Sequence, residues 1–177
     1  MTPQPVEPSP EKLVFSWDAV FAAVNAWRGE CMHHFSAVEQ AITETLLVLD
    51  ASRPEGSAIR LRHLIGQQFE DLAAAIGPEG PFAYLGKSAA LVLGQYRERH
   101  ETFRSKLCHG HVTVSVECNG HWLMVVRTLA IRARQADRTV DVIQQVEAEG
   151  KLAELKRDGQ KLAAVLGQVR KVAAVGR

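Results

Sequence analysis

The chain has 177 residues, of which 46% are apolar and 23% charged, a composition typical of a globular protein with one hydrophobic core. With 21 basic and 20 acidic side chains the net charge is +1, which excludes a global attraction to nucleic acid or to an anionic membrane. Three cysteines do not make a disulfide framework, and the sequence contains neither a membrane-spanning apolar run nor a secretory signal. We therefore expect a cytoplasmic protein without a membrane partner.

The N-terminal part of the chain predicts a tail followed by one domain. Residues 1–15 contain four prolines and few side chains that could pack, which predicts a disordered, proline-rich tail. Residues 16–177 then form a single domain that begins at Ser16, a suitable N-cap. Apolar residues recur at steps of three and four across 20–49, either in one long helix or in two helices divided at Gly29.

Two further helices are predicted in the middle of the chain. Ser57 can cap a helix whose apolar positions continue to Ile76. The glycines and prolines of residues 77–81 cannot continue it and must form a loop. The next helix covers residues 83–108 and should stop where Gly110 can adopt a left-handed conformation.

The periodicity changes after this helix. Apolar and polar residues alternate across 111–116, Asn119-Gly120 suits a two-residue type I′ turn, and residues 122–133 form a second β-rich run. Helical spacing returns in the apolar positions of residues 152–169. The sequence thus predicts a mainly α-helical bundle with one β-hairpin after the third helix.

The end of that third helix carries an unusual set of polar groups. Each helical residue turns by about 100°, and Phe103 and Leu107 mark the core side. On this scale Arg104 lies about 100° and His109 about 240° from Phe103, so both flank the outward face, roughly 140° apart. The two side chains can meet only if the helix ends near Cys108 and His109 folds back, or if a two-fold partner supplies the matching pair.

The same stretch, read as RSKLCHG over residues 104–110, resembles the Arg-x4-6-His signature of the HEPN superfamily (higher eukaryote and prokaryote nucleotide-binding domain). Many bacterial members carry it as Arg-Asn-x-Leu-Ala-His-Gly at a helix end. The positions kept in register are Arg104, Leu107, His109 and Gly110. Ser105 stands where a larger polar residue is usual, and Cys108 where alanine is frequent. The resemblance implies a HEPN-like helical bundle that works as a homodimer, with two motifs facing each other in one cleft.

For function, the resemblance implies a metal-independent endoribonuclease of the toxin or antiphage-defence type. Its partners would be RNA, a second copy of the chain and an antitoxin or other regulatory protein, and it would need no cofactor. The catalytic residues would be His109, whose imidazole can move protons near neutral pH, and Arg104, whose planar fork suits a phosphate. Around them we expect supporting roles for Ser105, Lys106, His111, Arg97 and Glu39, with Ser105 as a hydrogen-bond donor and Glu39 as an acidic partner.

Two other interpretations stay open at this stage. HEPN-like domains without catalysis serve as dimerisation or RNA-contact modules, and an arginine and a histidine near a helix end are also favourable against the helix dipole. A zinc-dependent protein is a third class, suggested by the Cys and His residues near Cys31 and Cys108. No pair of them has the spacing of a zinc knuckle, so we expect no metal site.

Overall fold

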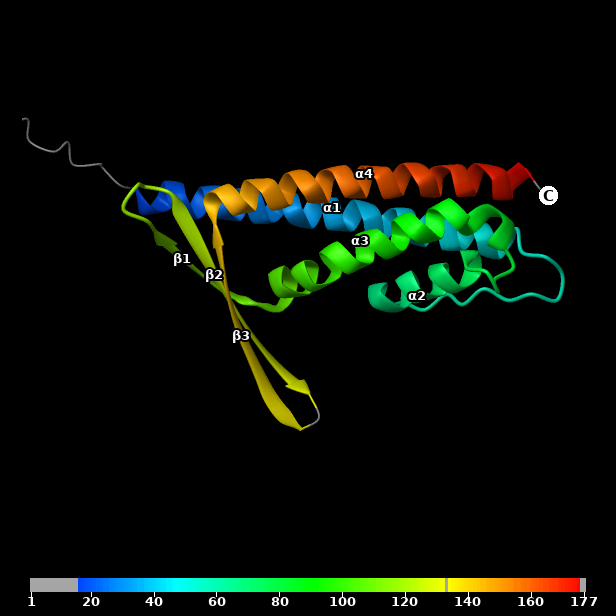
Figure 1. Ribbon diagram of the computed structural model, residues 1–177, viewed down its shortest axis with the longest axis horizontal. Helices are drawn as coiled ribbons and strands as arrows, with labels where there is room; N and C mark the ends of the chain where they lie inside the picture. The colour runs from blue at the N-terminus through cyan, green and yellow to red at the C-terminus, as the bar shows by residue number, and fades with distance from the viewer. Residues whose placement is uncertain (1–15, 133, 176–177) are drawn as a thin grey trace, which may run out of the picture.

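A computed structural model describes residues 16–132 and 134–175, and in that part the protein has four α-helices and a three-stranded antiparallel sheet (Figure 1). The predicted tail, residues 1–15, lies outside the described residues. None of the described helices is long and apolar enough to cross a membrane. In chain order the elements are α1 (Trp17–Ala51), α2 (Ile65–Ile76), α3 (Ala83–His109), β1 (His111–Val116), β2 (Trp122–Arg132), β3 (Gln135–Gln144) and α4 (Gln145–Val175).

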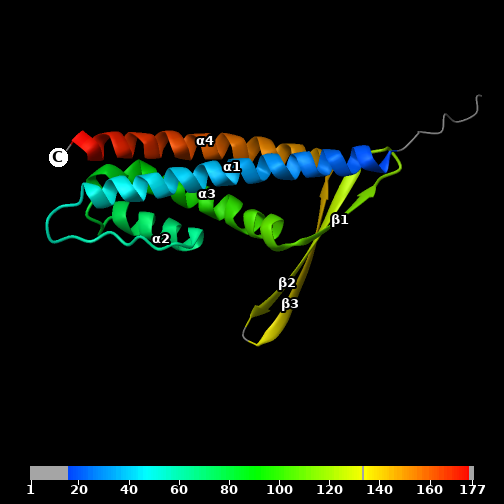
Figure 2. The same cartoon turned by 180° about the vertical axis from the view of Figure 1, so that it is seen from behind.

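Two long helices form the spine of the molecule. Figures 1 and 2 show α1 and α4 side by side and running in the same direction, with α3 returning beneath them and α2 packed against α3. The hydroxyl of Ser16 accepts a hydrogen bond from the backbone N–H of Ala19 at 3.4 Å, as an N-cap does. Helix α1 then continues through Gly29 without a break. The indole N–H of Trp27 donates to the carbonyl of Ala148 at 2.8 Å, which ties α1 to the first turns of α4.

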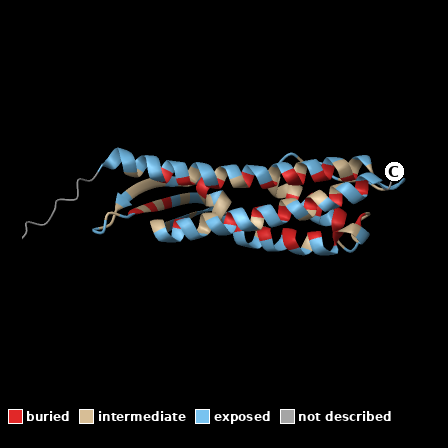
Figure 3. Ribbon diagram, turned by 90° about the horizontal axis from the view of Figure 1, so that it is seen from above, coloured by how far each residue is buried: buried red, intermediate tan, exposed pale blue. Residues whose placement is uncertain are grey.

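The core lies where these helices face one another, as the buried residues in Figure 3 show. The apolar period predicted across residues 20–49 is the buried face of α1, and each fully buried large apolar side chain contributes about 1.5–3 kcal/mol. Helix α4 matches it with a stripe at the same spacing. The residues of these two stripes include Val24, Phe35, Ile42 and Leu49 on α1 and Leu155, Leu162, Leu166 and Val169 on α4.

The second helix begins later than the sequence predicts. It starts at Ile65, whereas the capping pattern placed its start after Ser57. The reason is Asp71, a buried carboxylate that accepts hydrogen bonds from both the backbone N–H and the guanidinium of Arg62, at 3.1 and 2.8 Å. Because Arg62 bonds to a residue nine positions later in the chain, the segment before α2 must follow a non-helical path.

The predicted hairpin is part of a larger sheet. A third strand, β3, pairs with β2 from Leu123↔Gln144 to Arg132↔Gln135, and the sequence did not predict this strand. The first turn also differs from the predicted two-residue turn, because the connection spans residues 117–121. Only Gly120 in it has a positive φ, 84°, and its N–H donates to the carbonyl of Glu117 at 2.9 Å.

The far half of β2 and β3 forms an arm that extends away from the helices (Figure 1). Strand β1 pairs with β2 only as far as Arg127, so the ladder from Thr128 onward has two strands. Apolar side chains on the arm remain in solvent, with Leu129 68% and Ile131 83% exposed. The inner half of the sheet, by contrast, contributes Met124 and other buried residues to the core.

Helix α3 ends differently from the prediction at Gly110. The glycine has φ −78° and ψ 141°, an extended conformation rather than a left-handed one. Its N–H donates to the carbonyl of Lys106 at 2.8 Å. A Cβ atom added at Gly110 would lie 2.3 Å from Cγ1 of Val126 and 2.5 Å from the oxygen of Lys106. Glycine is required here by the close approach of the sheet, which sequence periodicity does not reveal.

This contact gives a testable prediction. We expect Gly110→Ala to lower the free energy of unfolding by about 1–3 kcal/mol, because the added methyl group must displace backbone or a packed valine. Gly94→Ala in the same helix is the matched control, since an added Cβ there meets nothing within 4 Å. It should raise the free energy of unfolding by about 0.5–1 kcal/mol through helix propensity. Urea denaturation measures both, and equal stability of the two variants would contradict the packing argument.

Candidate functional site

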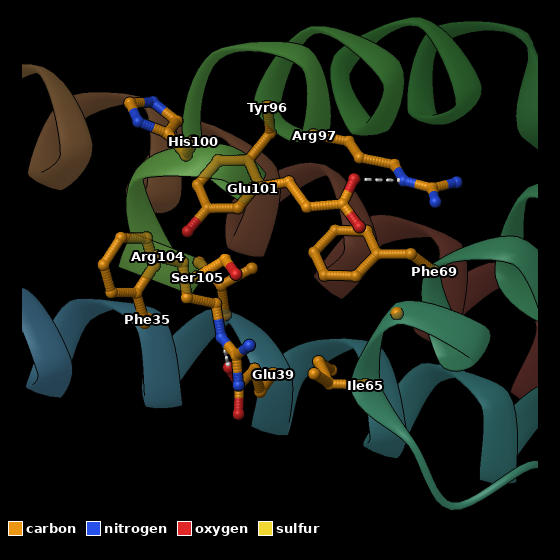
Figure 4. A pocket seen from close by; sticks show the side chains of 12 residues that line it. Phe35, Glu39, Ile65, Phe69, Tyr96, Arg97, His100, Glu101, Arg104 and Ser105 are labelled. Atoms are coloured by element: carbon orange, nitrogen blue, oxygen red, sulfur yellow. Dashed lines mark hydrogen bonds and ion pairs between the residues drawn. The ribbon is translucent and has the colours of Figure 1, made fainter. Parts of the chain in front are cut away.

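A cavity of about 160 Å³ opens between α1, α2 and α3 beside the predicted motif. Figure 4 shows aromatic side chains from all three helices around it, with the Arg97–Glu101 and Arg104–Glu39 pairs at two separate places on its wall. Its lining includes Phe35 and Glu39 from α1, Phe69 from α2, and Tyr96, Arg104 and Ser105 from α3. The structure therefore brings together four of the predicted site residues, Glu39, Arg97, Arg104 and Ser105, in one cavity.

Glu39 and Arg104 form an ion pair in this cavity. A carboxylate oxygen of Glu39 accepts a hydrogen bond from Nε of Arg104, and the two side chains are 27% and 26% exposed. Within the described residues the two terminal nitrogens of Arg104 donate no hydrogen bond. Glu39 thus holds the guanidinium by its inner nitrogen and leaves the outer fork available to a planar acceptor such as a phosphate.

Arg97 lies on the rim of the same cavity, but acidic side chains engage it. Its Nε donates to Glu101 at 2.7 Å, and its guanidinium lies 3.5 Å from the carboxylate of Glu70. The hydrogen bond that Arg97 donates to Glu101 raises the pKa of Arg97 above its ordinary value, against the opposing effect of burial. Arg97 therefore adds little free positive charge to the site.

Lys106 faces a different part of the molecule from Arg104. Its ammonium donates to the carboxylate of Asp141 on β3 at 2.6 Å, in a groove of about 250 Å³ between α3, β3 and α4. Lys106 lies two positions after Arg104 on the helix, a rotation of about 200°. The predicted cluster of motif side chains is thus divided between two sides of α3.

His109 is the last residue of α3 and is exposed to solvent. Its imidazole has no hydrogen-bond partner among residues 16–132 and 134–175. The helix includes His109 and closes with the bond from Gly110, so the alternative in which His109 folds back toward Arg104 does not occur. His111 begins β1 and is also exposed. In one copy of the chain, Arg104 and His109 therefore face different directions.

Helix α1 contributes side chains that the sequence analysis did not select. A terminal nitrogen of Arg28 donates to the carbonyl of Leu107 at 3.5 Å, and Sδ of Met32 lies 3.8 Å from Sγ of Cys108. These residues precede Phe35 and Glu39 by steps of four, three and four, which is one stripe of a helix. That spacing was the available signal for the α1 side of the site.

A second polar cluster, which includes His100 of the cavity lining, joins α3 to α4. Nε2 of His100 lies 3.1 Å from a carboxylate oxygen of Asp158, and Arg99 donates to the same oxygen at 3.1 Å. Burial raises the pKa of Asp158, but hydrogen bonds from His100, Arg99 and Arg157 outweigh it and hold that pKa below its ordinary value. Asp158 therefore stays ionised and anchors the middle of α3.

The cysteine and histidine residues do not assemble into a metal site in the part of the chain that the structure describes. No group of three or more His, Cys, Asp or Glu side chains there could hold a metal ion. Cys31 is buried in the core, and its burial, with a smaller effect of Glu30, raises the pKa of its thiol to about 12. The thiol is protonated at neutral pH, which disfavours metal binding.

Comparison of the chain with protein-family models, with curated proteins and with solved structures gave no match. The interpretation of the site therefore depends on its own geometry and chemistry.

Proposed function

We propose that the protein is a HEPN-like, cytoplasmic endoribonuclease of the toxin or antiphage-defence type that cleaves RNA without a metal ion as a homodimer. One observation carries the proposal: Arg104, held through Nε by Glu39, and His109, which has no hydrogen-bond partner in the described residues, lie on different sides of one helix end. Both groups suit phosphodiester chemistry, and a two-fold partner that presents the same helix end can bring them together.

The proposed reaction is attack of a 2′-hydroxyl on the adjacent phosphorus. The new bond joins the 2′-oxygen to phosphorus, the bond to the 5′-oxygen breaks, and the products are a 2′,3′-cyclic phosphate and a 5′-hydroxyl. One His109 imidazole takes the 2′-hydroxyl proton, and the imidazole of the second copy gives a proton to the leaving oxygen. The outer fork of Arg104 binds the oxygens on which negative charge accumulates.

A second candidate function is a non-catalytic HEPN-like dimerisation or RNA-contact module. The ion pair between Glu39 and Arg104 favours it, because a carboxylate beside the guanidinium offsets part of the charge that a phosphate would need. Both candidates need two copies of the chain, and they differ in whether a phosphodiester bond is broken.

The test is incubation of the purified protein with RNA in excess EDTA. We expect cleavage to continue, with fragments that end in a 2′,3′-cyclic phosphate identified by mass spectrometry. RNA that stays intact but is retained by the protein would support the non-catalytic module. Cleavage that stops on chelation and returns with a divalent ion would contradict the metal-independent mechanism.

The oligomeric state is a separate prediction. We expect static light scattering to give about twice the mass of the 19.5 kDa chain at micromolar concentration, because the composite site requires two copies. Mass measurements over a dilution series should parallel the specific activity. A protein that remains monomeric while it cleaves RNA would exclude the shared site.

A further inference from the structure

The cavity between α1, α2 and α3 has the dimensions of a small aromatic molecule. Its volume of about 160 Å³ is close to the roughly 150 Å³ of an apolar protein cavity that binds benzene. Rings provide much of the wall: Phe69 and Tyr96 lie nearly parallel, 8° apart, with centroids 6.2 Å from each other. A flat ring system is therefore the shape that this cavity accommodates.

A buried hydroxyl indicates that the occupant must also be polar. Tyr96 is 5% exposed, and within the described residues its hydroxyl has no hydrogen-bond partner. Burial, and after it the negative charge of Glu39, raises the pKa of the phenol, so the hydroxyl is neutral at physiological pH and can donate as well as accept. Figure 4 shows the ring reaching from α3 toward Phe35 and Arg104. An aliphatic occupant would leave this hydroxyl unsatisfied.

The charged groups at the cavity restrict the occupant further. Glu39 and Glu101 are both part of the lining, and each is paired with an arginine of the same lining, so the charges balance and the interior favours a neutral group. The outer fork of Arg104 lies at the same place and favours a phosphate beside it. A neutral, flat ring with a polar edge, attached to a phosphate, satisfies each of these conditions.

We infer that this cavity binds one unstacked nucleobase of single-stranded RNA, next to the phosphate that Arg104 contacts. The inference builds on the proposed function and adds a base-recognition pocket to it. The rings of Phe69 and Tyr96 contact the base, and the Tyr96 hydroxyl hydrogen-bonds its polar edge. Proteins commonly recognise single-stranded RNA by inserting unstacked bases among aromatic side chains.

The test measures binding with a 2′-O-methyl oligonucleotide, which cannot be cleaved by 2′-hydroxyl attack. Each base in turn is replaced by an abasic sugar, and affinity is read from fluorescence anisotropy. With the full-length protein we expect one abasic position to weaken binding about tenfold, the effect of losing one stacked base. Equal affinity across the whole abasic series would overturn the inference.

A variant that fills the cavity tests whether the base contributes to affinity by binding there. Ile65 lines the cavity, so Ile65→Trp should reduce binding of the intact oligonucleotide to the level of the abasic one. Leu64→Trp is the matched control, because Leu64 is 54% exposed, and it should retain the dependence on that base. Base dependence that survives in Ile65→Trp would place the pocket elsewhere.

Tyr96→Phe keeps the ring and provides a second variant if Ile65→Trp does not fold. We expect it to weaken binding of the intact oligonucleotide severalfold while binding of the abasic one is unchanged; equal losses for both would contradict the pocket. If one abasic position weakens binding but RNA is not cleaved, the ribonuclease proposal is rejected and the base pocket is retained. If RNA is cleaved but no abasic position changes the affinity, the base pocket is rejected and the ribonuclease proposal is retained.

Discussion

Replacing His109 by alanine is expected to lower the rate of RNA cleavage by about 10² to 10⁴-fold, the usual contribution of a general acid or base. The imidazole is exposed and unpartnered in the described chain, so its removal breaks no contact of the fold. Arg104→Ala should reduce the rate by about 10² to 10³-fold, because the charge that accumulates on the phosphate then loses a preorganised donor. Initial rates in EDTA, at equal concentrations of dimer, measure both effects.

Matched variants distinguish the loss of a catalytic group from a nonspecific effect of the substitution. His63→Ala removes another exposed histidine, on the segment before α2, and should leave the rate unchanged. Arg104→Lys keeps the positive charge but loses the planar fork, so its rate should fall between those of the wild type and Arg104→Ala. If both alanine variants cleave RNA at the wild-type rate, the motif plays no part in the reaction.

The largest expected loss of stability comes from Arg62→Ala. Without Arg62 the carboxylate of Asp71, which is 2% exposed, loses its hydrogen bonds from a cationic partner. We expect the free energy of unfolding to fall by about 3 kcal/mol at neutral pH, the low end for a broken buried pair, because Arg62 itself is partly exposed. Arg53→Ala removes an exposed pair with Asp50 and should cost less than about 1 kcal/mol.

The loss caused by Arg62→Ala should depend on pH. Burial raises the pKa of Asp71, but the hydrogen bonds from Arg62 outweigh burial and hold the folded-state pKa below its ordinary value. This stabilisation is therefore present above the unfolded-state pKa of about 3.9 and is lost as the pH falls through the folded-state pKa. Urea denaturation between pH 3 and 7 should show the two proteins converging at low pH. A difference that stays constant with pH would contradict this assignment.

The helical part of the fold could be predicted because the buried face of a helix appears in the sequence as apolar residues every three or four positions. The period across residues 20–49 appears as the buried face of α1, and the change of period after Gly110 marks the entry into the sheet. The start of α2 could not be predicted, since it depends on Arg62 reaching Asp71. Strand β3 was missed because an arm with both faces largely in solvent does not alternate clearly between polar and apolar residues.

The sequence singled out several polar side chains of the candidate cavity, but neither its aromatic residues nor its arrangement. Helix geometry gave the directions of Arg104 and His109, because five residues along a helix define their angle. The contact between Glu39 and Arg104 depends on how α1 and α3 cross, which no local spacing encodes. The same holds for Lys106, whose partner Asp141 lies on the strand that the sequence did not reveal.

The β2–β3 arm divides the sheet into two regions of different local stability. Near the helices three strands and buried side chains hold the ladder, while from Thr128 outward each strand has one neighbour and little burial. A two-stranded ladder is marginal by itself, so backbone amides should exchange with solvent faster toward the tip without opening the helices. Since no residue lining the Arg104 cavity lies on the arm, its tip is the position where a fluorophore or an inserted peptide would disturb the site least.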